Sequence, residues 1–319
     1  MNRRLALFQV VISLIALGAV AWWASHQEAP EIPSSASALA WLAGGALLYV
    51  VATLVRAERW HSILHLIGVR ARRSDCYSLT TVGYMGNNVL PARAGEMLRV
   101  VLLDAKTKSG KRTLLGTIVA ERLLDAIVLG GLFVATVYGV LDGDVLPTDR
   151  PVLVAGIGFL AIVLAGVVFH VLRRRGALQR LRDFARPLAG APRSLVSRTG
   201  AILLVATVGL WLLEGAVYLA VARAVELGIS TSGALYLVAL TNFVAALPAA
   251  PGSIGTFDAA VAFGAKALGG AGAVVVSYLL LLRFILYVPI TLVGLAVMVV
   301  RYGGWTRLRE VARLQASRA

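Results

Sequence analysis

Eight ionisable side chains stand inside or beside stretches of the sequence that are otherwise apolar. Arginine carries a permanent charge and a planar fork of donors, which suits bidentate binding of a phosphate group. Carboxylates beside it could meet a cationic or hydroxylated part of the same ligand. That the eight only pair with one another and hold helices together remains an open alternative. The candidate binding residues are Arg93, Glu96, Arg99, Glu121, Arg122, Asp125, Glu214 and Arg283.

Two turns rich in proline and glycine interrupt the apolar stretches 75–105 and 233–269, and both read L-P-A-x-x-G. A half-helix that begins after such a turn directs free N–H groups and a positive dipole end into the protein. We expect Ser253 and Thr256 to cap the second half-helix. The asparagines before the turns either satisfy unwound backbone or act as local caps. The residues assigned to the breaks are Asn88, Pro91, Gly95, Asn242, Pro248, Pro251, Gly252 and Ser253.

The composition identifies the kind of chain that must position these groups. Of the 319 residues, 59% are hydrophobic and 15% are charged, whereas soluble domains have about a quarter charged residues. An ordinary soluble domain and a disordered chain are therefore excluded. The net charge of +15 would suggest nucleic acid in a soluble protein. Here it fits the excess of basic residues on cytoplasmic loops of membrane proteins, so we expect no nucleic-acid partner.

Six apolar runs are long enough to cross a bilayer of roughly 30 Å. Their periodicity is helical or uniformly apolar, without strand-like alternation. The sequence therefore predicts an all-α polytopic membrane protein. The predicted spans are residues 5–25, 37–55, 114–141, 151–172, 199–222 and 273–300.

The distribution of lysine and arginine predicts the orientation of these spans. Five connecting and terminal segments hold 24 of the 31 basic residues, which places them and both termini in the cytoplasm, at a bacterial-type inner membrane. Segment 75–105 then enters and leaves from the cytoplasm, and segment 233–269 enters and leaves from outside. Each is predicted to be a re-entrant helical hairpin, and the two are oppositely oriented. The basic segments are 1–4, 56–74, 105–113, 173–198 and 301–319.

These predictions combine into an inverted-topology repeat within a single membrane domain, residues 1–319. Unit A covers residues 37–141, unit B covers residues 199–300, and residues 301–319 form a basic cytoplasmic tail. Inverted repeats with broken helices near the midplane are typical of secondary transporters.

Two motifs resemble a known family. The stretch Gly86–Arg99, GNNVLPARAGEMLR, followed by Glu121-Arg122-x-x-Asp125, resembles the lysylphosphatidylglycerol synthase transmembrane-region family, as do Ala246–Phe257 and Arg283. The resemblance covers nearly the whole chain and implies a lipid flippase or lipid-transport role. Relatives are also linked to lipid-linked sugars and hopanoids. Because 19 residues follow residue 300, we expect no soluble aminoacyl-transferase domain and no synthase activity.

The leading functional prediction is a transporter, not an enzyme, that moves a lipid with an anionic, phosphate-bearing headgroup between leaflets. One alternative is an intramembrane transferase acting on a phospholipid or a polyprenyl-phosphate-linked sugar, although no nucleophile–base pair or metal set is recognisable. Another is a non-transporting scaffold for a lipid-modifying enzyme. We expect membrane lipids as partners and neither cofactor nor metal. A homo-oligomer and a separate lipid-modifying enzyme as partner stay open.

Overall fold

The computed structural model describes residues 32–90, 94–139, 195–246 and 251–304, together with the isolated positions 18, 22, 25, 26 and 30. Helices dominate this part of the chain, and it contains no strand, so the all-α prediction is confirmed for it. The predicted spans 5–25 and 151–172 and the tail lie essentially outside it. The elements are α2 (Ala36–Leu66), α3 (Arg73–Val89), α4 (Ala94–Thr107), α5 (Lys111–Gly139), α9 (Arg198–Ala224), α10 (Thr231–Ala246), η2 (Pro251–Ser253), α11 (Thr256–Ala267) and α12 (Gly272–Tyr302).

Three of the described helices, α2, α9 and α12, are long and apolar enough to cross a membrane. At about 1.5 Å per residue, the 31 residues of α2 and of α12 each extend over roughly 46 Å. That length exceeds the hydrocarbon core of about 30 Å. The chain is a multi-pass membrane protein.

Helix α2 begins where the sequence predicts and ends later. The hydroxyl of Ser35 caps it by accepting the Ala38 N–H at 3.2 Å. The predicted span ended at residue 55, with Arg56 and Arg59 in a cytoplasmic loop. In the structure the helix continues to Leu66, and both arginines are buried, with 7% and 4% exposure. The prediction was wrong because these charges have partners inside the protein.

The two interrupted stretches each form a pair of short helices. Helices α3 and α4 cross closely, because a Cβ added at Gly95 would lie 1.9 Å from the carbonyl oxygen of Gly83. A Cβ added at Gly86 would lie 2.6 Å from the Cα of Gly95. Helices α10 and α11 flank the second break, where Gly252 adopts a left-handed φ of 63° that favours glycine.

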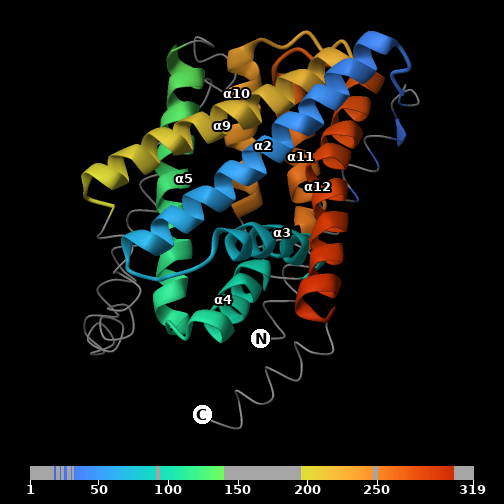
Figure 1. Ribbon diagram of the computed structural model, residues 1–319. Helices are drawn as coiled ribbons and strands as arrows, with labels where there is room; N and C mark the ends of the chain where they lie inside the picture. The colour runs from blue at the N-terminus through green and yellow to red at the C-terminus, as the bar shows by residue number, and fades with distance from the viewer. Residues whose placement is uncertain are drawn as a thin grey trace, which may run out of the picture.

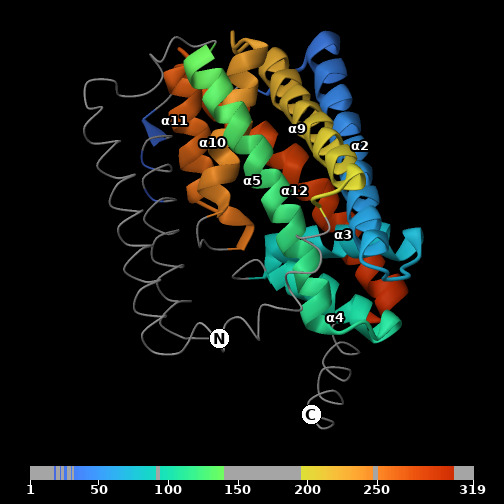
Figure 2. The same cartoon turned by 90° about the vertical axis from the view of Figure 1, so that its left-hand side faces the viewer.

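Each of the long helices α2, α5, α9 and α12 contacts at least one of the short pairs. Helices α2 and α9 run side by side, α3 and α4 lie at one end of the molecule, and α10 and α11 lie toward the other end (Figures 1 and 2). Helix α3 packs against α12, and α10 packs against α5. The first break therefore lies against the C-terminal part of the chain, and the second pair packs on the N-terminal part.

Candidate functional site

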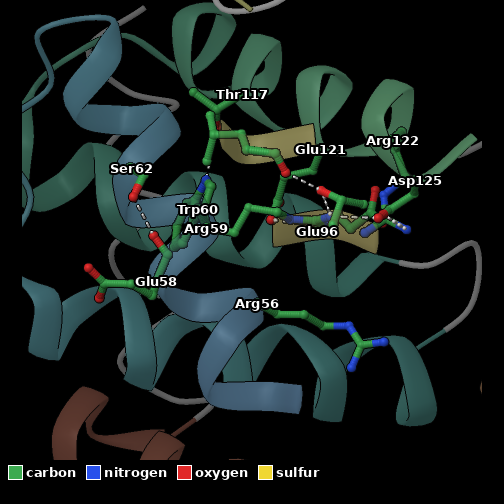
Figure 3. A network of polar contacts seen from close by, with 12 residues as sticks. Arg56, Glu58, Arg59, Trp60, Ser62, Glu96, Thr117, Glu121, Arg122 and Asp125 are labelled. Atoms are coloured by element: carbon green, nitrogen blue, oxygen red, sulfur yellow. Dashed lines mark hydrogen bonds and ion pairs between the residues drawn. The ribbon is translucent and has the colours of Figure 1, made fainter. Parts of the chain in front are cut away.

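Arg59 of α2 is the centre of a buried network of ion pairs. Its Nη1 donates to Asp125 Oδ1 at 2.7 Å and to Thr207 Oγ1 at 3.1 Å. Its Nη2 lies 3.9 Å from Glu121 Oε1. Helices α2, α5 and α9 are therefore joined through one guanidinium that is 2% exposed. Figure 3 shows Glu121, Arg122 and Asp125 projecting from α5 toward the α2 side chains.

A second arginine also forms an ion pair with Glu121. Arg99 of α4 donates from Nη2 to Glu121 Oε2 at 3.0 Å. Its guanidinium carbon lies 4.0 Å from the centroid of a Trp60 ring, within cation–π range. The Trp60 indole N–H is itself satisfied by Thr117 Oγ1 at 3.0 Å. Sequence reasoning placed Glu121 and Asp125 on one helix face, and their common contact with Arg59 agrees with that placement.

Arg122 is the most accessible member of the network, with a side chain that is 43% exposed. Its Nε lies 3.6 Å from Glu96 Oε1, and its Nη1 lies 3.5 Å from Asp125 Oδ2. The Trp211 indole N–H donates to Asp125 Oδ1 at 3.2 Å. Asp125 thus accepts hydrogen bonds from α2 and α9 and forms an ion pair with Arg122 of its own helix.

Arg56 and Glu214 form the next ion pair, between α2 and α9. The Arg56 guanidinium lies 5.8 Å from the Tyr84 ring and 5.4 Å from the Trp211 ring. The Nη1 atom of Arg56 is buried without a hydrogen-bond partner. This atom is therefore a buried donor that no acceptor among the described residues satisfies.

The network carries equal numbers of positive and negative side chains. Sequence reasoning predicted arginines that bind a phosphate group, with carboxylates beside them, and it missed two of the arginines. Arg56 and Arg59 are three residues apart, so both lie on one face of α2 once the helix continues past residue 55. The charged members are Arg56, Arg59, Glu96, Arg99, Glu121, Arg122, Asp125 and Glu214.

Arg283 lies in a separate cluster at the second break. Its Nε and Nη2 donate to the two carboxylate oxygens of Asp258 at 2.6 and 3.0 Å. Its Nη1 donates to the Gly252 carbonyl at 3.3 Å. The rings of Phe257 and Tyr287 lie 5.3 and 4.7 Å from the guanidinium. Asp258 was not among the predicted site residues.

Asp258 also changes the predicted capping of α11. The N-cap is Gly255, and its N–H donates to Asp258 Oδ2 at 2.8 Å. The hydroxyl of Thr256 instead donates to the Ser253 carbonyl at 3.2 Å. The prediction that Ser253 and Thr256 cap the helix was wrong, because a carboxylate three residues after the N-cap provides a charged acceptor.

Two adjoining cavities connect the clusters. One, of about 120 Å³, extends toward Gly252, Ser253 and Tyr287, and the other, of about 80 Å³, extends toward Glu96 and Arg122. The smaller cavity is mostly polar, and the larger one is lined about equally by polar and apolar atoms. The Oδ1 atom of Asn87 is buried beside them without a hydrogen-bond partner among the described residues. The residues that line both are Tyr49, Tyr84, Asn87, Glu214 and Asn242.

The remaining predicted residues divide into three groups. Arg93, Pro91 and Pro248 lie outside the described residues. Asn88 donates to Thr291 Oγ1 at 2.8 Å, and Asn242 donates to the Val238 carbonyl at 2.9 Å within its own helix.

Pro251 opens the short η2 helix, and Gly95 lies at the α3–α4 crossing. Within the described ranges, no group of three or more His, Cys, Asp and Glu residues is placed to hold a metal ion.

Comparison with known proteins identifies the family. The model of the lysylphosphatidylglycerol synthase TM region matches residues 7–294. The chain belongs to this family. A relative from Haloferax volcanii, the glycosyltransferase AglD, is 24% identical over 148 residues, which are 46% of this chain and 24% of the relative. The chain thus spans about a quarter of the length of that curated relative. The resemblance noted from the two motifs is confirmed.

Proposed function

We propose that this family member is a transporter that moves a lipid with a phosphate-bearing headgroup between leaflets. The observation that carries the proposal is the pair of adjoining cavities between the two breaks. Ionisable groups at membrane depth usually face a cavity or a partner. Here buried donors and acceptors border both cavities.

The arrangement of charges supports binding of an anion without a permanent excess of positive charge. When the cavities are empty, each arginine has a carboxylate partner. A phosphate diester can take the place of a carboxylate at Arg56 or Arg122, because both present N–H donors at the smaller cavity. Glu214 is then available to accept from a hydroxyl or ammonium group of the same headgroup.

An inverted repeat is the second part of the proposal. The packing pattern is unchanged when α2 is exchanged with α9, α3 with α10, α4 with α11, and α5 with α12. The third residue of α4 and of α11 is an acid, and the twelfth residue of α5 and of α12 is an arginine. In both cases the acid and the arginine are paired. Two equivalent units of opposite orientation are the architecture that allows alternating access in many transporters.

Site-specific labelling tests the orientation of the repeats. In a Cys76→Ser background, single cysteines replace Lys108, between α4 and α5, and Thr231, at the start of α10. We expect a membrane-impermeant maleimide to label Lys108→Cys only from the cytoplasmic side and Thr231→Cys only from the outside. Labelling of both from one side would contradict the inverted arrangement.

Lipid exchange in proteoliposomes tests transport. The readout is the rate at which a headgroup-labelled lipid in the inner leaflet becomes accessible to an impermeant quencher. We expect the wild type to accelerate exchange of labelled phosphatidylglycerol more than of phosphatidylcholine. Glu214→Gln should slow exchange at least tenfold.

Arg73→Gln is the matched control, because the 69% exposed Arg73 pairs with Glu58 outside the cavities. Wild-type vesicles that behave like protein-free vesicles would refute transport.

An intramembrane transferase is the second candidate, and the name of the Haloferax relative favours it. Such an enzyme would release a new lipid product when supplied with a donor lipid, whereas a transporter leaves the lipid unchanged. A scaffold for a separate enzyme would tolerate Glu214→Gln. Mass spectrometry of the lipids after the exchange assay distinguishes transferase from transporter.

A further inference from the structure

A third cavity lies away from the ion-pair network, where the ends of several helices meet. It has a volume of about 360 Å³. The α2–α3 connection contributes Arg70 and Arg72, the last turn of α4 contributes Lys106, and the end of α12 contributes Arg301. Among the described residues that line it, Asp75 is the only acid.

The single carboxylate is already shared by two of the four cations. Asp75 Oδ1 accepts from Lys106 Nζ at 2.5 Å and from Arg301 Nη2 at 3.4 Å. Arg301 also donates from Nη1 to the Ser74 carbonyl at 2.9 Å and to Ser78 Oγ at 2.5 Å. These contacts fix Lys106 and Arg301 in place beside the cavity.

Arg70 and Arg72 differ from these two cations, because neither forms an ion pair with any residue of the described ranges. Lys106 and Arg301 stand at the C-terminal ends of α4 and α12, where they offset the negative ends of the helix dipoles. Arg70 and Arg72 instead precede the positive end of α3, and Arg72 is the N-cap of that helix without a side-chain cap. Their charge is uncompensated, so the cavity attracts an anion.

The position of the cavity separates it from the proposed transport path. Asp75, at this cavity, and Asn87, at the other two, are twelve positions apart on α3. That interval corresponds to roughly 18 Å along the helix. Within the part of the chain that the structure describes, this cavity shares no lining residue with either of the other two. Helix α12, long and apolar enough to cross a membrane, ends at the cavity, which places it at a boundary between hydrocarbon and water.

We propose that this cavity binds the phosphate group of an anionic membrane lipid, and that it does so whether or not the chain transports lipid. The headgroup phosphate lies among Arg70, Arg72, Lys106 and Arg301, and the acyl chains remain in the bilayer beside α12. A soluble phosphate compound offers the same charge and the same oxygen acceptors. Only the lipid also gains from burial of its acyl chains.

Binding is measured on the purified full chain by native mass spectrometry, in a zwitterionic detergent with added phosphatidylglycerol or phosphatidylcholine. The variant is Arg70→Gln/Arg72→Gln, and the control is Arg73→Gln, which removes an adjacent arginine that does not line the cavity. We expect the double variant to lose at least tenfold in phosphatidylglycerol occupancy and to bind phosphatidylcholine like the wild type. Arg73→Gln should retain wild-type occupancy of both lipids.

Thermal unfolding provides the second readout and distinguishes the two sources of phosphate. Phosphatidylglycerol should raise the Tm of the wild type and of Arg73→Gln, but not of the double variant, whose Tm without lipid should match the wild type. Inorganic phosphate at the same concentration should not reproduce the rise. Equal phosphatidylglycerol occupancy in the double variant would overturn the site, and an equal effect of inorganic phosphate would overturn its assignment to a lipid.

Discussion

Each of the two breaks is followed by an ion pair between an acid and an arginine, and the two ion pairs differ in distance and exposure. After the first break, Glu96 on α4 pairs with Arg122 on α5 at 3.6 Å, and after the second, Asp258 on α11 pairs with Arg283 on α12 at 2.6 and 3.0 Å. The Arg122 side chain is 43% exposed and that of Arg283 is 22% exposed. The same pairing is therefore loose and accessible at one break, and bidentate and enclosed at the other.

The surroundings of each pair explain the difference. Arg122 is also 3.5 Å from Asp125, whose other contacts are with Arg59 and Trp211, so its partner is shared among several donors. Arg283 has Asp258 as its sole carboxylate among the described residues, and two rings cover it. In our proposal the first pair therefore exchanges a carboxylate for a ligand, whereas Arg283 of the second pair donates to the backbone of its break at Gly252.

The largest expected difference between the two pairs is in stability. Arg283→Gln leaves the buried Asp258 without its bidentate partner, and we expect a loss of about 3 kcal/mol, the lower end for a broken buried pair. Arg122→Gln should cost no more than about 1 kcal/mol, because its pair is long and partly exposed. Thermal unfolding of the purified variants measures both. Equal losses would contradict the distinction between an enclosed and an accessible pair.

The crossings of the two short-helix pairs should also respond differently. In Gly95→Ala the new Cβ meets the Gly83 carbonyl, which is backbone and cannot move aside, so we expect a loss near the top of the roughly 1–3 kcal/mol range for overpacking. In Gly264→Ala the new Cβ meets the ends of the Leu237 and Leu240 side chains, which can change rotamer. Gly264→Ala serves as the control, and its free energy of unfolding should fall by less than about 1 kcal/mol, because side-chain ends can move aside. An equal fall in Tm for Gly264→Ala and Gly95→Ala would contradict the view that the α3–α4 helix pair crosses more tightly than the α10–α11 helix pair.

The smallest expected effect concerns the backbone of the second break. Gly252 has a φ of 63°, so Gly252→Ala places a side chain in the left-handed region at a cost of roughly 1 kcal/mol. Gly209→Ala is the control, because Gly209 lies within α9 and a Cβ there meets no atom within 4 Å. That control should be neutral or slightly stabilising, since alanine favours a helix more than glycine does. A Tm for Gly252→Ala at or above wild type would show that the break adopts another conformation.

Sequence reasoning predicted the elements better than the contacts. Hydropathy located α5, α9 and α12 to within a few residues, and the repeated L-P-A-x-x-G pattern located both breaks. Both signals are local, because apolar length and turn residues depend on neighbouring positions alone. The shared face of Glu121 and Asp125 follows from their spacing on one helix, and both contact Arg59.

The missed residues depend on partners that are distant in the chain. Arg59 lies 66 residues before Asp125, and Arg56 lies 158 residues before Glu214. An arginine after an apolar run is ordinarily a loop residue, and only the tertiary partner makes its burial favourable. Asp258 was missed for the same reason, since its role depends on Arg283 of the next helix.

The most direct test of the account fills the cavity without changing any charge. Ala245 is half-buried and lines the cavity of about 120 Å³ near the second break, so Ala245→Trp should block the path. The control, Ala201→Trp, adds the same ring to an exposed position of α9. The measurement is the exchange rate of headgroup-labelled phosphatidylglycerol in proteoliposomes containing equal amounts of folded protein. The account predicts at least a tenfold loss for Ala245→Trp and a near wild-type rate for Ala201→Trp. Equal, near wild-type rates for both variants would contradict a lipid path through the cavities.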